Sequence, residues 1–158
     1  MKRRGGCTNR GGFSLLEVVI VVAIIAILAA IGIPRMSRGS KGANDSALSG
    51  DLAVLRNAIE LYSAEHGGSY PSGTDIADQL TQYSDVSGGF GAKSSTRIYG
   101  PYIRTVPPMP VGTKKGKTGI ATATDPNSGW IYEPSTGKIR ADAGALEADD
   151  TGKLYINY

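Results

Sequence analysis

The stretch FSLLEVVIVVAIIAILAAIGI, residues 13–33, decides the fold of this 158-residue chain. It is apolar throughout except for small residues and one ionisable side chain, Glu17. A helix of this length extends roughly 31 Å at ~1.5 Å per residue, which matches the hydrocarbon thickness of a bilayer. Pro34 ends the apolar run. The sequence therefore predicts a transmembrane helix over residues 13–34.

The residues before this stretch form a short basic head, 1–12. It holds four of the 17 basic residues and no acidic one. The rest of the chain therefore contains 13 basic and 14 acidic residues. The formal net charge of +3 therefore belongs to the head, and the remaining charge gives no reason to expect a nucleic-acid partner. The single cysteine, Cys7, also lies there, which excludes an internal disulfide and a cysteine-based metal cluster.

A polar segment, residues 35–66, follows with the periodicity of an amphipathic helix. Its apolar residues recur at spacings of four and three and stop before Gly67 and Gly68. These apolar positions are Leu48, Leu52, Leu55, Ile59 and Tyr62. The pattern predicts a helix that packs this stripe of side chains against the rest of the chain.

The last segment, residues 67–158, shows no long helical pattern and predicts loops and short strands. Residues 130–132 and 138–140 flank a turn-forming sequence and predict a β-hairpin. Residues 153–157 are a plausible third strand and 119–124 a weaker one, while the prolines of 107–110 predict an extended connection. A small antiparallel sheet laid on the apolar helix stripe would give an α+β fold.

Glu17 argues against a simple membrane anchor. A charged group within an apolar span costs roughly 2.5–3.5 kcal/mol on insertion scales, so we expect it to be retained for a function. A secretory signal peptide fits no better, because its apolar core is only ~7–15 residues long and its small-residue cleavage site follows the core. Here the small residues, Gly11 and Gly12, precede the apolar run.

The sequence GFSLLEV at residues 12–18, after a basic head, resembles the type III signal of type IV pilins and type II secretion pseudopilins. The resemblance implies cleavage after Gly12 by an inner-membrane prepilin peptidase and N-methylation of Phe13. It also implies assembly roles for Glu17 and for Pro34, which lies where many pilins have a helix-bending proline. The implied fold is pilin-like, a long N-terminal helix from about residue 13 to residue 66 packed on a small antiparallel β-sheet.

The function implied by the resemblance is structural. We expect a pseudopilin that polymerises into the pseudopilus of a type II secretion system, anchored by one span in the inner membrane with its C-terminal region on the periplasmic side. Its expected partners are further copies of itself, the prepilin peptidase, the assembly platform and minor pseudopilins. The mature chain lacks the cysteine pair of many type IV pilins, which favours a pseudopilin. A type IV pilin or minor pilin for adhesion, twitching or DNA uptake is the alternative. A membrane-tethered binding module that never polymerises is a third possibility.

Enzymatic activity is not expected. The chain has one histidine, His66, and lacks a nucleophile-elbow motif or a histidine pair for zinc. A basic loop at Lys114, Lys115 and Lys117 has the wrong glycine spacing for a phosphate-binding loop and is expected to be exposed.

An acidic stretch near the C-terminus is the candidate metal site. Four carboxylates lie within nine residues: Asp142, Glu147, Asp149 and Asp150. Clustered carboxylates supply the oxygen ligands that Ca²⁺ prefers, and the resemblance adds that major pseudopilins bind calcium in this region. A solvated acidic loop is the alternative.

Overall fold

The computed structural model describes residues 12–149 and 151–158, and the side chains of all of these except residues 31–38. The contacts within the chain divide it into two compact units, Met1–Gly39 and Ser40–Tyr158. Most of the predicted leader, residues 1–11, lies outside the described residues, as do Asp150 and the side chain of Pro34.

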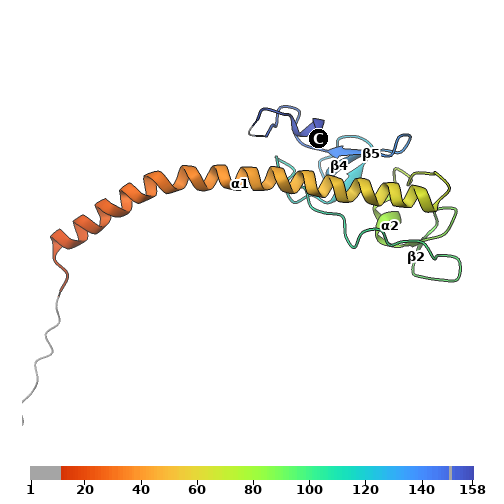
Figure 1. Ribbon diagram of the computed structural model, residues 1–158, viewed down its shortest axis with the longest axis horizontal. Coiled ribbons are helices and arrows are strands. Elements are labelled where there is room, and N and C mark those ends of the chain that lie inside the picture. Colours follow the sequence, from red (N-terminus) through yellow and green to blue (C-terminus); the bar gives the residue numbers. More distant parts are fainter. Residues whose placement is uncertain (1–11, 150) are drawn as a thin grey trace, which may run out of the picture. The chain divides into compact units, whose positions relative to one another are not determined.

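One long helix, α1, spans Leu15–Glu65 and includes both the apolar run and the amphipathic segment (Figure 1). The helix continues through position 34. Proline there removes one main-chain hydrogen bond because it has no N–H, but it does not end the helix. The prediction of a long N-terminal helix over about residues 13–66 is confirmed.

The end of α1 is set by two glycines, as the sequence predicts. Gly67 and Gly68 have φ values of 64° and 89°, in the left-handed region that glycine adopts without a steric cost. The N–H of Gly68 donates to the carbonyl oxygen of Ser63 at 2.8 Å. This bond satisfies one of the carbonyl groups left free in the last turn.

The core of the second unit forms along one face of α1. All five residues of the predicted stripe are buried, with Leu48, Leu52, Leu55 and Ile59 at 0% exposure and Tyr62 at 2%. They belong to one hydrophobic cluster with Trp130, Tyr132 and Ile139 of the sheet. The amphipathic pattern therefore predicted correctly which side of the helix is covered.

Short strands follow a short helix, α2 (Ile76–Thr81), that the sequence did not reveal. Strands β1 (Tyr83–Ser84) and β2 (Phe90–Gly91) pair antiparallel. The predicted hairpin is confirmed by β4 (Ser128–Glu133) and β5 (Lys138–Ala141), in which Tyr132 lies opposite Ile139. The weaker predicted strand is β3 (Gly119–Ala121), which joins β4 in parallel. The α+β fold is confirmed.

The prediction of a strand over residues 153–157 is wrong. Tyr155–Asn157 forms a short 3₁₀ helix, η1, and Leu154 makes only an isolated bridge to Ala148. The physical reason is that Tyr155 is anchored by its side chain, whose hydroxyl donates to Asp45 Oδ1 of α1 at 2.7 Å. A side chain buried against a helix fixes this segment without a neighbouring strand.

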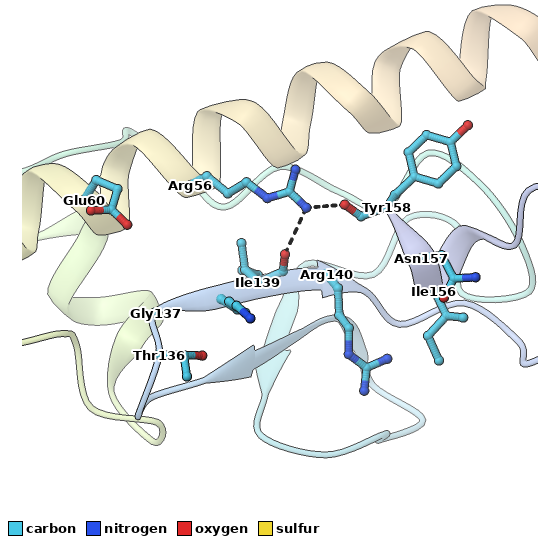
Figure 2. A pocket seen from close by; sticks show the side chains of 10 residues that line it. Arg56, Glu60, Thr136, Gly137, Ile139, Arg140, Ile156, Asn157 and Tyr158 are labelled. Carbon is cyan, nitrogen blue, oxygen red and sulfur yellow. Dashed lines mark hydrogen bonds between the residues drawn. The ribbon is translucent and has the colours of Figure 1, made fainter.

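Arg56 connects α1 to the sheet and to the C-terminal segment. Its guanidinium donates to the main-chain oxygens of Ile139, at 3.3 Å, and of Tyr158 (Figure 2). These contacts lie at a pocket of about 490 Å³ that Lys138 and Arg140 also border. The arginine therefore fixes the position of β5 and the last residues against α1.

The sequence also predicts a membrane span over residues 13–34. Within the described residues, no helix combines the length and the apolar character needed to cross a membrane. The span over residues 13–34 stays a prediction of the sequence.

Candidate functional site

The first candidate site is the beginning of α1, where Ser14 caps the helix. The N–H of Leu16 donates to Ser14 Oγ at 3.3 Å, and the N–H of Val18 donates to the carbonyl oxygen of Ser14 at 3.2 Å. A serine at this position satisfies N–H groups that have no partner within the helix. The helix therefore begins at Leu15, which would be the third residue of a chain cleaved after Gly12.

Glu17 lies in the first turn of α1. A carboxylate is favoured there by the partial positive charge of the helix N-terminus. The spacing of Ser14 and Glu17 is that of a capping box, but the N–H that donates to Ser14 Oγ belongs to Leu16 and not to Glu17. A test of Glu17 must therefore separate its charge from its contribution to the helix end.

The described residues leave open space around Gly12. A Cβ atom added there would meet none of the described atoms within 4 Å. Close packing against the described residues thus gives no reason for glycine at this position.

The residues that follow expose an apolar surface. Every residue from 12 to 30 is exposed, including Phe13 at 84% and Leu15 at 82%. A helix that is apolar on all sides is stable only when lipid or protein covers it. The described first part of α1, residues 15–30, thus presents its apolar side chains on the outside of the chain.

The second candidate site, the C-terminal acidic stretch, does not bring together those of its carboxylates that the structure describes. Glu147 accepts main-chain N–H groups of Thr113 and Gly144, both at 2.9 Å. Asp149 accepts the N–H groups of Thr151, at 2.8 Å, and Lys153, at 2.9 Å. In the part of the chain that the structure describes, no three acidic, histidine or cysteine residues are grouped to hold a metal ion.

Asp142 is held differently, because its partner is a lysine. Lys114 Nζ lies 2.6 Å from Asp142 Oδ2, and the two side chains are 15% and 1% exposed. Burial by itself would raise the pKa of the Asp142 carboxyl, but hydrogen bonds from Lys114, Ser128 and the N–H of Asp125 together lower it. The sequence predicted an exposed basic loop at Lys114. For this lysine the prediction is wrong, because its side chain is mostly buried beside Asp142.

His66 has a structural place at the end of α1. Its Nδ1 lies 2.8 Å from the carbonyl oxygen of Tyr62 and its Nε2 lies 3.2 Å from Ser84 Oγ. A carbonyl only accepts, so Nδ1 carries the proton. The ring is buried and stacked on Tyr62, with 3.8 Å between the ring centroids. Through these contacts the imidazole holds the end of α1 against strand β1.

The start of α1 thus combines a capped helix end and an exposed apolar surface with one carboxylate. A family model described as the prokaryotic N-terminal methylation motif matches residues 7–33. The chain carries this methylation motif. The motif marks type IV pilin-like proteins and pseudopilins, which are substrates of prepilin peptidase, so the resemblance noted in the sequence is confirmed.

The methylation motif covers Gly12, Phe13 and Glu17 but not residues 34–158. No curated protein and no solved structure matches the chain. The motif points to a structural pilin-like protein, a class that usually lacks enzymatic activity. It does not distinguish a secretion system from a pilus system.

Proposed function

We propose that this protein is a structural subunit of a type II secretion pseudopilus and polymerises through the first half of α1. The observation that carries the proposal is the exposed apolar surface of residues 13–30, which lies within the methylation motif and has Glu17 in its first turn. Copies of such a helix bury one another's apolar surfaces when they bundle, which supplies a driving force for a fibre.

Before assembly, lipid covers this surface. The basic head, residues 1–12, favours the cytoplasmic side of the inner membrane, and Ser40–Tyr158 then lies on the periplasmic side. Prepilin peptidase cleaves after Gly12, and the new amino group of Phe13 is methylated. The assembly platform and minor pseudopilins complete the set of proposed partners.

Glu17 sets the axial register between neighbouring helices in the proposed fibre. The mature chain offers no basic side chain between residues 13 and 34, so the cation available to this carboxylate is the amino group of Phe13. In one chain that group lies one helical turn away, at about 6 Å of axial rise. In the fibre, the Phe13 amino group of the neighbouring subunit takes its place. Because an unpaired buried charge is costly, the pair penalises every other register.

Pro34 has the second proposed assembly role. It removes one main-chain hydrogen bond where the apolar part of α1 meets the amphipathic part. A helix is more easily bent where such a bond is missing. The resemblance to pilins, which often have a proline here, supports this assignment.

The secretion system is preferred to a pilus because Cys7 is the only cysteine and lies in the leader. Many type IV pilins close their C-terminal region with a cysteine pair. Deletion of the gene should leave exported proteins in the periplasm while surface pili remain. Loss of surface pili with normal secretion would instead assign the protein to a pilus.

The direct test of assembly replaces Glu17 by leucine and by glutamine in cells that contain the peptidase. Both variants should be cleaved after Gly12 but should build few or no fibres, because both lack the charge. The matched control is Glu60→Leu, which removes an exposed carboxylate from the second half of α1.

The outcomes separate the two roles of Glu17. Normal fibres with Glu17→Gln but not with Glu17→Leu would show that only the helix cap matters. A cleaved Glu17→Leu chain that builds normal fibres would refute the assembly role altogether. A protein that is never cleaved and never polymerises would be a tethered binding module.

A further inference from the structure

Asp142 follows β5 and is a carboxylate with almost no contact with solvent. Its exposed fraction is 1%, and its main-chain N–H donates to the carbonyl oxygen of Gly129 on β4 at 2.8 Å. Its Oδ2 accepts Ser128 Oγ at 2.7 Å and the N–H of Asp125 at 3.2 Å. A buried carboxylate of this kind is stable only with a cation beside it.

Lys114 supplies that cation from a distant loop. Its Nζ lies 2.6 Å from Asp142 Oδ2 and 2.9 Å from the main-chain carbonyl oxygen of Asp125. The ammonium thus lies between a carboxylate and a carbonyl oxygen. Both are the oxygen donors that a hard cation such as Ca²⁺ takes in proteins.

The second carboxylate oxygen of Asp142, Oδ1, is a further acceptor at this site. Asp142 Oδ1 is buried and has no hydrogen-bond partner in the structure. An unsatisfied buried acceptor costs free energy. The site therefore has the character of a cation site that is filled by an ammonium group and keeps one oxygen unused.

The residues do not fit the calcium site that the family resemblance implies. Of the carboxylates expected to share one ion, Glu147 and Asp149 each accept main-chain N–H groups of nearby loops instead. Asp150 lies outside the described residues. The described carboxylates thus do not converge, and the one that is deeply buried already has a positive partner.

We propose that Lys114 is a built-in cation that takes the place of a bound divalent metal in this region. Its ammonium joins the loop that carries it to Asp125 and to Asp142 at the end of β5. A covalently attached cation cannot be removed by a chelator or diluted away. The folded state of Ser40–Tyr158 is therefore independent of the calcium concentration.

The test measures thermal unfolding of the full chain in detergent, with Trp130 as the probe. Trp130 is the only tryptophan, is fully buried and lies one residue from Gly129, the partner of Asp142. The wild-type melting temperature should be the same in millimolar Ca²⁺ and in chelator. A native calcium site would instead raise it with ligand concentration.

The Lys114→Met variant leaves a buried carboxylate without its cation. Its melting temperature should fall by about 10–20 °C in chelator. Millimolar Ca²⁺ should restore part of that loss, because the oxygens of Asp142 and Asp125 are then available. The matched control is Lys117→Met, which removes an exposed lysine of the same loop and should shift the melting temperature by no more than about 3 °C.

The double variant Lys114→Met/Asp142→Asn covers the case in which the single variant fails to fold. It removes both charges, so it should melt above Lys114→Met and should not respond to calcium. The proposal is overturned if calcium stabilises the wild type or if Lys114→Met melts like Lys117→Met. A double variant no more stable than the single one would also overturn it.

Discussion

Replacing Leu52 by alanine tests whether the apolar stripe holds the second half of α1 to the sheet. Leu52 is fully buried in the core, and a leucine-to-alanine change at such a site costs about 2–5 kcal/mol. In a unit of the size of Ser40–Tyr158, each kcal/mol shifts the melting temperature by about 3–6 °C. We therefore expect Leu52→Ala to lower the melting temperature by about 6–30 °C.

Val54 is the matched control, because it lies two residues along the same helix and is 49% exposed. Val54→Ala should change the free energy of unfolding by no more than about 0.5 kcal/mol. Both variants are followed by thermal unfolding of the unassembled chain, using Trp130 fluorescence. Equal losses of stability in the two variants would refute the assignment of the buried face.

Two further predictions concern the C-terminal region. Gly137 has φ of 69°, and a Cβ atom there would lie 2.4 Å from Tyr70 Cε1, whereas Gly116 has φ of 87° and open space. Gly137→Ala should therefore lower stability by about 1–3 kcal/mol more than Gly116→Ala in urea unfolding, and equal losses would contradict the close approach. Because the pKa of Asp142 is lowered in the folded state, its stabilising effect is present above the ordinary value of 3.8 and is lost as the pH falls below it. Thermal unfolding between neutral pH and about pH 3 should show a smaller acid-dependent loss for Asp142→Asn than for the wild type, and an unchanged loss would contradict this pairing.

The long helix and its buried face could be predicted because they depend on local patterns. The four-and-three spacing from Leu48 to Tyr62 places five side chains on one face whatever lies opposite. Gly67 and Gly68 mark the helix end for a reason that is also local, the left-handed backbone conformation. The hairpin of β4 and β5 follows from the turn residues between its strands.

The C-terminal segment could not be predicted because distant residues decide its structure. Tyr155 is placed by the hydroxyl contact with Asp45 and by the bond from its N–H to the carbonyl oxygen of Glu147 at 3.0 Å. The run of Leu154, Tyr155 and Ile156 that suggested a strand carries no information about these partners. Helix α2 was missed because its six residues are too few to show a period.

The candidate sites differ in the same way. Gly12, Phe13 and Glu17 form one contiguous motif that a peptidase and a neighbouring subunit can read as a sequence. The acidic stretch suggested a shared ion because its carboxylates are close along the chain. Their partners in the structure, such as Lys114 for Asp142 and Thr113 for Glu147, come from a separate loop that sequence spacing does not reveal.

The proposed function depends on processing at the start of α1, which the mass of the mature N-terminus tests most directly. The protein should be purified from cells that contain prepilin peptidase and its N-terminal peptide analysed by mass spectrometry. We expect a chain that begins at Phe13 and carries a methyl group on its amino nitrogen. A chain that retains Met1 and residues 2–12 in those cells would contradict it.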